Sequence, residues 1–96
     1  MTIEMQPPRP QKDAPFTLLV RVFDKAGNAV SNASVHGSIV MSTADRGRQE
    51  LDFRNAGDGL YRIETRVPVS GSWEVWLTAT RGSDRVQQYT PFQVAP

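Results

Sequence analysis

The sequence predicts an all-β domain, namely an immunoglobulin-like antiparallel β-sandwich of six or seven strands that holds no disulfide. Short runs of alternating apolar and polar residues recur at spacings of about 10 residues, as strands of such a sandwich do. Clusters of Gly, Asn, Asp and Pro separate these runs and indicate turns. No stretch shows the 3.6-residue apolar period of a helix. A small β-barrel is the alternative that the same pattern allows.

Length and composition restrict the possible classes of protein. A chain of 96 residues corresponds to one small domain. The absence of cysteine excludes disulfides, thiolate metal sites and a cysteine nucleophile. The net charge of +1 provides no general field that would attract nucleic acid or an anionic membrane. The sequence has no apolar run near the roughly 18 residues that a membrane span needs.

The first 15 residues hold four of the seven prolines. Because proline lacks a backbone donor and favours extended neighbours, residues 6–15 are expected to be an extended, poorly packed lead-in or linker. A short edge strand over residues 3–5 is compatible with this expectation. The sandwich domain is predicted over residues 16–96.

The first half of the domain supplies three predicted strands. Residues 16–23 alternate, and turn residues follow at 24–28. Residues 33–41 form the next strand, and Gly37 in it leaves room for a large neighbour or marks a bulge. After a polar loop over 42–47, residues 49–54 form a short strand that ends at a turn over 55–59. The side chains expected to point inward are Phe16, Leu18, Val20, Val22, Val35, Ile39, Met41, Leu51 and Phe53.

The second half contains the two tryptophans. Strands are predicted over 60–67 and 72–80, with a turn at 68–71 between them, and a tight hairpin turn at 81–84 leads to a closing strand over 85–94. Pro91 places that last strand at a sheet edge or breaks it. The inward side chains of this half are Tyr61, Ile63, Thr65, Val67, Trp73, Val75, Leu77 and Ala79.

The sequence predicts no enzymatic activity. His36 is the only histidine, and Ser34 and Ser38 stand two residues from it on the same strand face. Side chains at that spacing are about 6.5–7 Å apart, which is too far for a nucleophile to hydrogen-bond its base. The carboxylates fall in turns or on outward faces, where solvent keeps them in the ordinary ionised form. Neither a nucleophile elbow nor a phosphate-binding loop is present in the sequence.

A copper site is the metal chemistry to consider, because imidazole and thioether ligands suit copper. His36 and Met41 are five residues apart and therefore face opposite sides of a regular strand. Met1 and Met5 lie in the lead-in. The favoured interpretation is a surface histidine and a core methionine with no cofactor, and His36 is kept as the one candidate copper ligand.

An outward-facing tryptophan gives the strongest indication of function. Trp73 and Trp76 are three residues apart, so they face opposite sides of one strand. In an immunoglobulin-like topology the strands over 33–41 and 72–80 are neighbours, which places Trp76, Val40 and His36 on one outward face. We expect this face to bind a protein partner. The alternative is that the N-terminal segment or nearby arginine side chains cover the indole. Leu19 and Phe23 form a similar candidate on the other sheet.

Residues 16–94 resemble the FixH/YtkA-like group of small extracytoplasmic sandwich domains. The pattern consists of a strand with D-x-x-G-x-x-V-x-x-A-x-V, a strand start G-x-Y and a strand start G-x-W. The residues that carry it are Phe23, Asp24, Gly27, Asn28, Ala29, Val30, Ala33, Ser34, Val35, Gly59, Leu60, Tyr61, Gly71, Ser72, Trp73, Glu74 and Val75. The resemblance implies the sandwich fold and an extracytoplasmic, periplasmic location.

The FixH branch of this group implies a domain that an N-terminal membrane helix tethers. The branch is linked to the assembly of haem-copper terminal oxidases, alongside a copper-exporting ATPase. The proline-rich lead-in fits a juxtamembrane linker, and the Met-rich segment of some YtkA-like members is absent after Met41. The sequence therefore predicts a non-catalytic interaction domain that docks a membrane-protein complex. Two alternatives remain, namely a generic immunoglobulin-like structural or adhesion module of a larger surface protein, and a copper carrier that uses His36 and methionines.

Overall fold

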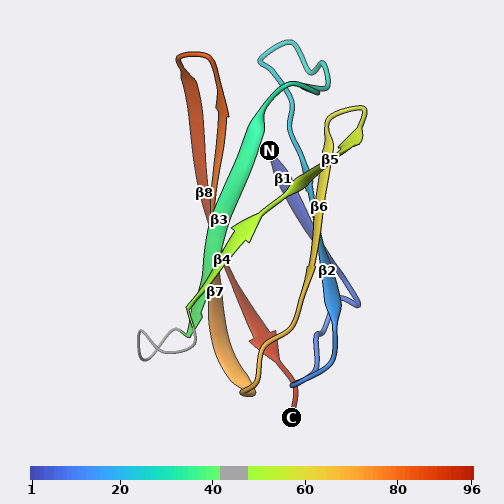
Figure 1. Ribbon diagram of the computed structural model, residues 1–96, viewed down its shortest axis with the longest axis vertical. Helices are drawn as coiled ribbons and strands as arrows, with labels where there is room; N and C mark the ends of the chain where they lie inside the picture. Colours follow the sequence, from blue (N-terminus) through green and yellow to red (C-terminus); the bar gives the residue numbers. More distant parts are fainter. Residues whose placement is uncertain (42–47) are drawn as a thin grey trace.

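Two four-stranded antiparallel sheets pack face to face in the computed structural model, which describes residues 1–41 and 48–96 (Figure 1). The expected polar loop over 42–47 lies outside the described residues. The first sheet has the order β1 (Thr2–Gln6), β2 (Phe16–Arg21), β6 (Leu60–Thr65) and β5 (Arg54–Gly57). The second has the order β4 (Gln49–Asp52), β3 (Ser34–Met41), β7 (Gly71–Arg81) and β8 (Asp84–Val94).

This strand order confirms the predicted all-β sandwich. With β1 to β8 as strands A, B, C, C′, D, E, F and G, the sheets read ABED and C′CFG, which is an immunoglobulin-like arrangement. The optional edge strand over residues 3–5 forms as β1, which accounts for seven strands. The eighth described strand is β5, because the predicted strand over 49–54 ends at Asp52 and a separate strand follows it. The described residues include no helix of the length and hydropathy that would span a membrane.

The core lies between the sheets and consists of the alternate residues that the sequence pattern selects. Trp73 is fully buried at its centre, and its indole Nε1 donates a hydrogen bond to the Val69 carbonyl oxygen at 2.9 Å. This bond satisfies the one polar group that the ring carries into the interior. The buried hydrophobic residues are Phe16, Leu18, Val20, Val22, Val30, Val35, Ile39, Leu51, Tyr61, Val67, Trp73, Val75, Leu77, Ala79 and Val94.

The N-terminal segment packs more closely than its proline content suggests. β1 pairs antiparallel with β2 along its whole length, and Pro10 is buried. The Pro10 carbonyl accepts a hydrogen bond from the Ala95 N–H at 2.9 Å, and the Lys12 N–H donates to the Ala95 carbonyl at 2.8 Å. Proline removes a donor but leaves the carbonyl and the neighbouring N–H groups, so an extended proline-rich segment still fastens to a strand.

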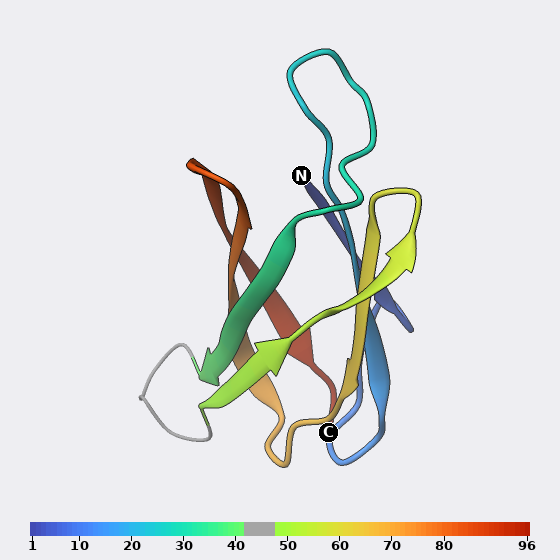
Figure 2. The same ribbon diagram turned by 45° about the horizontal axis from the view of Figure 1, so that its top comes forward.

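Residues 49–57 cross from one sheet to the other, which differs from the expected single strand and turn. β4 pairs with β3, and after Phe53 the chain continues as β5, which pairs with β6 (Figure 2). All four β5 residues are exposed, so no apolar alternation signals this strand. The turn is confined to Asp58 and Gly59, and these two residues and Gly57 before them all have positive φ.

Candidate functional site

The outward face of the β4-β3-β7-β8 sheet brings the three predicted site residues together. β3 and β7 are paired neighbours, as expected, and Ser38 lies opposite Trp76. On β3, His36 lies two residues before Ser38 and Val40 two residues after it. Trp76 retains 50% of its surface exposed, so the indole is not fully covered within the described residues. Its role in binding a partner remains a prediction.

Two small residues of β3 let the strand lie close to Trp76. A Cβ at Gly37 would overlap the Trp76 carbonyl oxygen, so only glycine fits the backbone spacing found here. Ser38 points outward but is only 5% exposed, because it stands between the longer side chains of Glu50 and Trp76. The close approach of β3 and β7 supports Trp76 on a firmly packed sheet.

Trp76 belongs to a group with Tyr89 and Glu74, which we call the Trp76 cluster. The centroids of the Trp76 and Tyr89 rings are 4.7 Å apart, and their planes are tilted by 53°. The Trp76 Nε1–H donates to Glu74 Oε1 at 3.3 Å, and the Tyr89 hydroxyl donates to Glu74 Oε2 at 3.2 Å. One carboxylate therefore bridges both half-exposed rings through hydrogen bonds.

The surroundings of the Tyr89 hydroxyl change its pKa. Partial desolvation, the hydrogen bond to Glu74 and the negative charge of that carboxylate raise the pKa of Tyr89 above its ordinary value of 10.0. The phenol is therefore protonated at neutral pH and acts as a hydrogen-bond donor to Glu74. The surface that the cluster presents combines two aromatic rings with one carboxylate.

The interpretation of the sequence did not include Tyr89 or Glu74 in the site. The hairpin supplies the missing signal, because a two-residue loop pairs Arg81 with Asp84 and fixes the register along both strands. Counting back from that pair places Trp76 opposite Tyr89. Glu74 lies two residues before Trp76 on the same face.

His36 is exposed on the same face, between Asp52 on β4 and Thr78 on β7. Met1, Met5 and Met41 pack instead against the core. Among residues 1–41 and 48–96, no three His, Asp or Glu side chains gather as a metal site would require. The described residues thus keep the imidazole and the thioethers apart.

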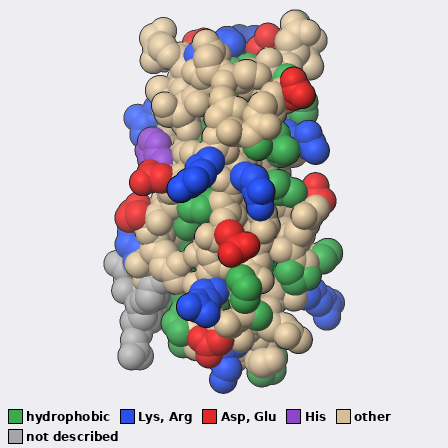
Figure 3. Space-filling view, turned by 45° about the vertical axis from the view of Figure 1, so that its right-hand side comes forward, with side chains coloured by type: hydrophobic (Ala, Val, Ile, Leu, Met, Phe, Trp, Pro, Cys, Tyr) green, Lys and Arg blue, Asp and Glu red, His purple; other side chains and the backbone are tan. Residues whose placement is uncertain are grey.

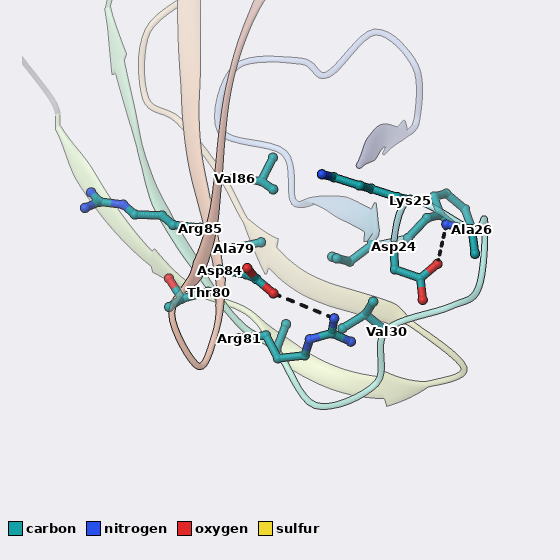
Figure 4. Close-up of a pocket in the computed structure, with 13 residues that line it drawn as sticks. Asp24, Lys25, Ala26, Val30, Ala79, Thr80, Arg81, Asp84, Arg85 and Val86 are labelled. Atoms are coloured by element: carbon teal, nitrogen blue, oxygen red, sulfur yellow. Dashed lines mark hydrogen bonds and ion pairs between the residues drawn. The ribbon is translucent and has the colours of Figure 1, made fainter.

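A groove of about 640 Å³ opens at one end of the sandwich, between the β2–β3 connection and the β7–β8 hairpin (Figure 4). Phe23 and Val86 are large exposed hydrophobic residues in its lining, and Lys25 and Arg85 add positive charge. Arg81 and Asp84 form an ion pair at 3.9 Å across the hairpin. Leu19, the residue predicted to accompany Phe23, lies on β2 opposite Glu4 and Arg62 and is not part of the groove lining.

Asp24 shapes one wall of this end groove. Its Oδ1 accepts hydrogen bonds from the Asn28 and Ala26 N–H groups, both at 2.9 Å. The backbone hydrogen bond from Asn28 is the main cause that lowers the pKa of Asp24 below its ordinary value. The carboxylate therefore acts as a structural acceptor for the turn.

Figure 3 shows the molecule turned so that the right-hand side of Figure 1, where β6 and β5 lie, comes forward. Lys and Arg side chains alternate there with Asp and Glu, and apolar side chains are scattered between them. Mixed charge of this kind is typical of a solvated surface. The Trp76 cluster, with two large exposed aromatic rings in contact, is the candidate functional site.

The FixH family model matches residues 9–92, which is most of the chain. The chain belongs to the FixH family. No curated protein matches it. A solved structure from Bacteroides vulgatus, described as a candidate glycoside hydrolase, is similar with a TM-score of 0.66 and 19% sequence identity. The similarity covers 92% of this chain and 16% of that one, so the chain spans about a sixth of that protein's length, and the likeness concerns the fold alone.

Proposed function

We propose that this FixH-family domain is a non-catalytic, extracytoplasmic docking module of an accessory protein in haem-copper oxidase assembly. In this proposal the Trp76 cluster recognises a membrane-protein partner. The family match supports the accessory role. The observation that carries the docking role is a half-exposed Trp76 held against Tyr89 by a shared carboxylate.

The physical argument rests on the energetics of aromatic contacts. Tryptophan and tyrosine side chains dominate the binding energy of many protein interfaces. Rings that are already oriented in the free protein lose less conformational freedom on binding. Glu74 orients both rings through its two oxygens, and the sheet beneath is firmly packed. A partner would bind by burying the ring faces and by donating a hydrogen bond to the carboxylate.

Photo-cross-linking in native membranes tests this function. A benzophenone amino acid replaces Trp76 in the full-length protein, and a matched control carries it at Phe23, which is 43% exposed at the end groove. We expect irradiation to attach a haem-copper oxidase subunit or the copper-exporting ATPase at position 76, identified by mass spectrometry. Equal adducts at both positions, or none at position 76, would contradict the proposal.

A further inference from the structure

The four edge strands of the sandwich differ in how well they are protected. β1, β5 and β4 have five, four and four residues, whereas β8 has eleven. β4 also carries Glu50 and Asp52, whose like charges discourage pairing with another strand. A long edge strand exposes a row of unpaired N–H and C=O groups, which is a template for a further strand. β8 is therefore the edge that requires explanation.

Alternation along β8 shows which residues face the free edge. The Ala95 N–H donates a hydrogen bond to the Pro10 carbonyl, and the Ala95 carbonyl accepts one from the Lys12 N–H, so both groups point away from β7. Backbone groups two residues apart point the same way, so those of residues 85, 87, 89, 91 and 93 also face the edge. Pro91 agrees with this assignment, since a proline in a strand is tolerated where its missing N–H would face away from the ladder.

The free edge is interrupted at Pro91 and Ala95 in its C-terminal half and open over its N-terminal half. Residues 10–12 cover the Ala95 end, and Pro91 offers no donor. Arg85, Gln87 and Tyr89 present an N–H and a C=O each, and no described strand pairs with them on that side. The β7–β8 hairpin tip stands clear of the other sheet in both views (Figure 1, Figure 2). Arg85 is the one charged residue of the segment 85–89, and an antiparallel pairing of this segment with itself would place the two Arg85 residues at opposite ends.

We infer that this open half of β8 pairs antiparallel with β8 of a second copy of the chain, about a two-fold axis at Gln87. The pairing sets Arg85 opposite Tyr89 of the second copy and Gln87 opposite itself. In this register all three N–H and all three C=O groups of each copy find partners. A shift toward the hairpin leaves Tyr89 opposite the turn, and a shift toward the C-terminus places Arg85 opposite Pro91, which has no donor.

The side chains on the outward face favour a second copy over an unrelated strand. Arg85 of one copy lies beside Tyr89 of the other, where a guanidinium attracts an aromatic ring. Tyr89 donates to the Glu74 carboxylate, so the positive charge also approaches a negative one. The two-fold axis makes this contact twice. Charge and hydrogen bonding are thus both self-complementary in the one register that the edge allows.

Sedimentation equilibrium of the full chain over a range of concentrations tests the inference. We expect the wild type to dimerise and Gln87→Pro to raise the dimer dissociation constant by on the order of 30-fold, since each copy loses one intermolecular donor. The N–H at Gln87 faces away from β7, so the fold retains its own ladder. Gln93→Pro is the matched control, because it changes an edge-facing glutamine outside the paired segment and leaves the dissociation constant unchanged.

Amide hydrogen exchange of the wild-type chain provides a readout that needs no variant. The N–H groups of Arg85, Gln87 and Tyr89 gain protection as the protein concentration rises and lose it on dilution. Three outcomes would overturn the inference. They are a monomer at millimolar concentration, a dimer whose dissociation constant Gln87→Pro and Gln93→Pro change equally, and exchange rates at these amides that do not depend on protein concentration. None of these outcomes bears on Trp76 cross-linking, so the two proposals fail separately.

Discussion

Tyr61→Phe tests whether a single buried hydroxyl fastens β6 to the β2–β3 connection. The Tyr61 hydroxyl donates to the Val30 carbonyl at 2.8 Å and accepts from the Ala33 N–H at 3.0 Å. The ring is 2% exposed, and Phe fills almost the same volume, so the change removes the oxygen with little effect on packing. The two backbone groups that bond it lie 28 and 31 residues away along the chain.

The expected loss follows from those two bonds. A hydrogen bond contributes about 1 kcal/mol net, and a buried group left without its partner costs about 1–3 kcal/mol. The Val30 carbonyl accepts the buried bond and the Ala33 N–H is partly solvated, so we expect a total loss of about 2–3 kcal/mol. For a domain of this size that lowers Tm by roughly 15 °C.

Urea titration and calorimetry measure this loss, with Tyr89→Phe as the control because it removes an exposed phenol. We expect the control to change stability little. A loss for Tyr61→Phe below about 0.5 kcal/mol would refute the reasoning, because it would mean that both backbone groups find water or another partner without cost.

Three further perturbations probe the site and the end groove. Gly37→Ala is expected to destabilise the fold by about 1–3 kcal/mol in urea titration, because its Cβ meets the Trp76 carbonyl, and an unchanged midpoint would contradict the close approach. Glu74→Gln is expected to lower the pKa of Tyr89 toward its ordinary value in an NMR titration. An unchanged pKa would contradict a contribution of the Glu74 carboxylate to the raised pKa. Asp24→Asn is expected to lower Tm at neutral pH. Since folding lowers the pKa of Asp24, the stabilisation by its carboxylate is lost as pH falls through the folded-state pKa. The Tm values of the wild type and of Asp24→Asn should therefore converge in acid, and a Tm difference that does not depend on pH would contradict this.

Most of the sandwich could be predicted because its core positions alternate with polar ones. The face that carries Trp73, Val75, Leu77 and Ala79 is buried throughout, as period-two patterning requires. β5 could not be predicted, since its four residues are all exposed and only its pairing with β6 makes it a strand.

The packing of residues 10–12 was missed for a different reason. Proline content reports the loss of donors, but it says nothing about the carbonyl of Pro10 or the N–H of Lys12, which both bond Ala95. Those contacts join the two ends of the sequence. Pairing over such a separation depends on tertiary arrangement, which local composition does not contain.

The candidate site was partly accessible from sequence. The three-residue offset between the tryptophans requires one of them to face outward, and Trp76 does so. Tyr89 required counting register across the hairpin, and the role of Glu74 required the positions of two rings relative to one carboxylate. Periodicity gives the face that a residue occupies, whereas the neighbours on that face depend on register.

Tyr89 connects the two surfaces proposed for this domain, since its ring belongs to the Trp76 cluster and its backbone lies on the open edge of β8. A two-fold axis perpendicular to the joined sheet leaves both clusters on the same outward face. Three strand spacings and a four-residue offset then separate the two Trp76 positions by about 20 Å. A partner that presents two equivalent sites at that distance would bind both clusters at once, and the second contact would form at a high effective concentration. For such a partner, Gln87→Pro would weaken binding without altering the Trp76 cluster itself, whereas for a partner with one site it would leave binding unchanged.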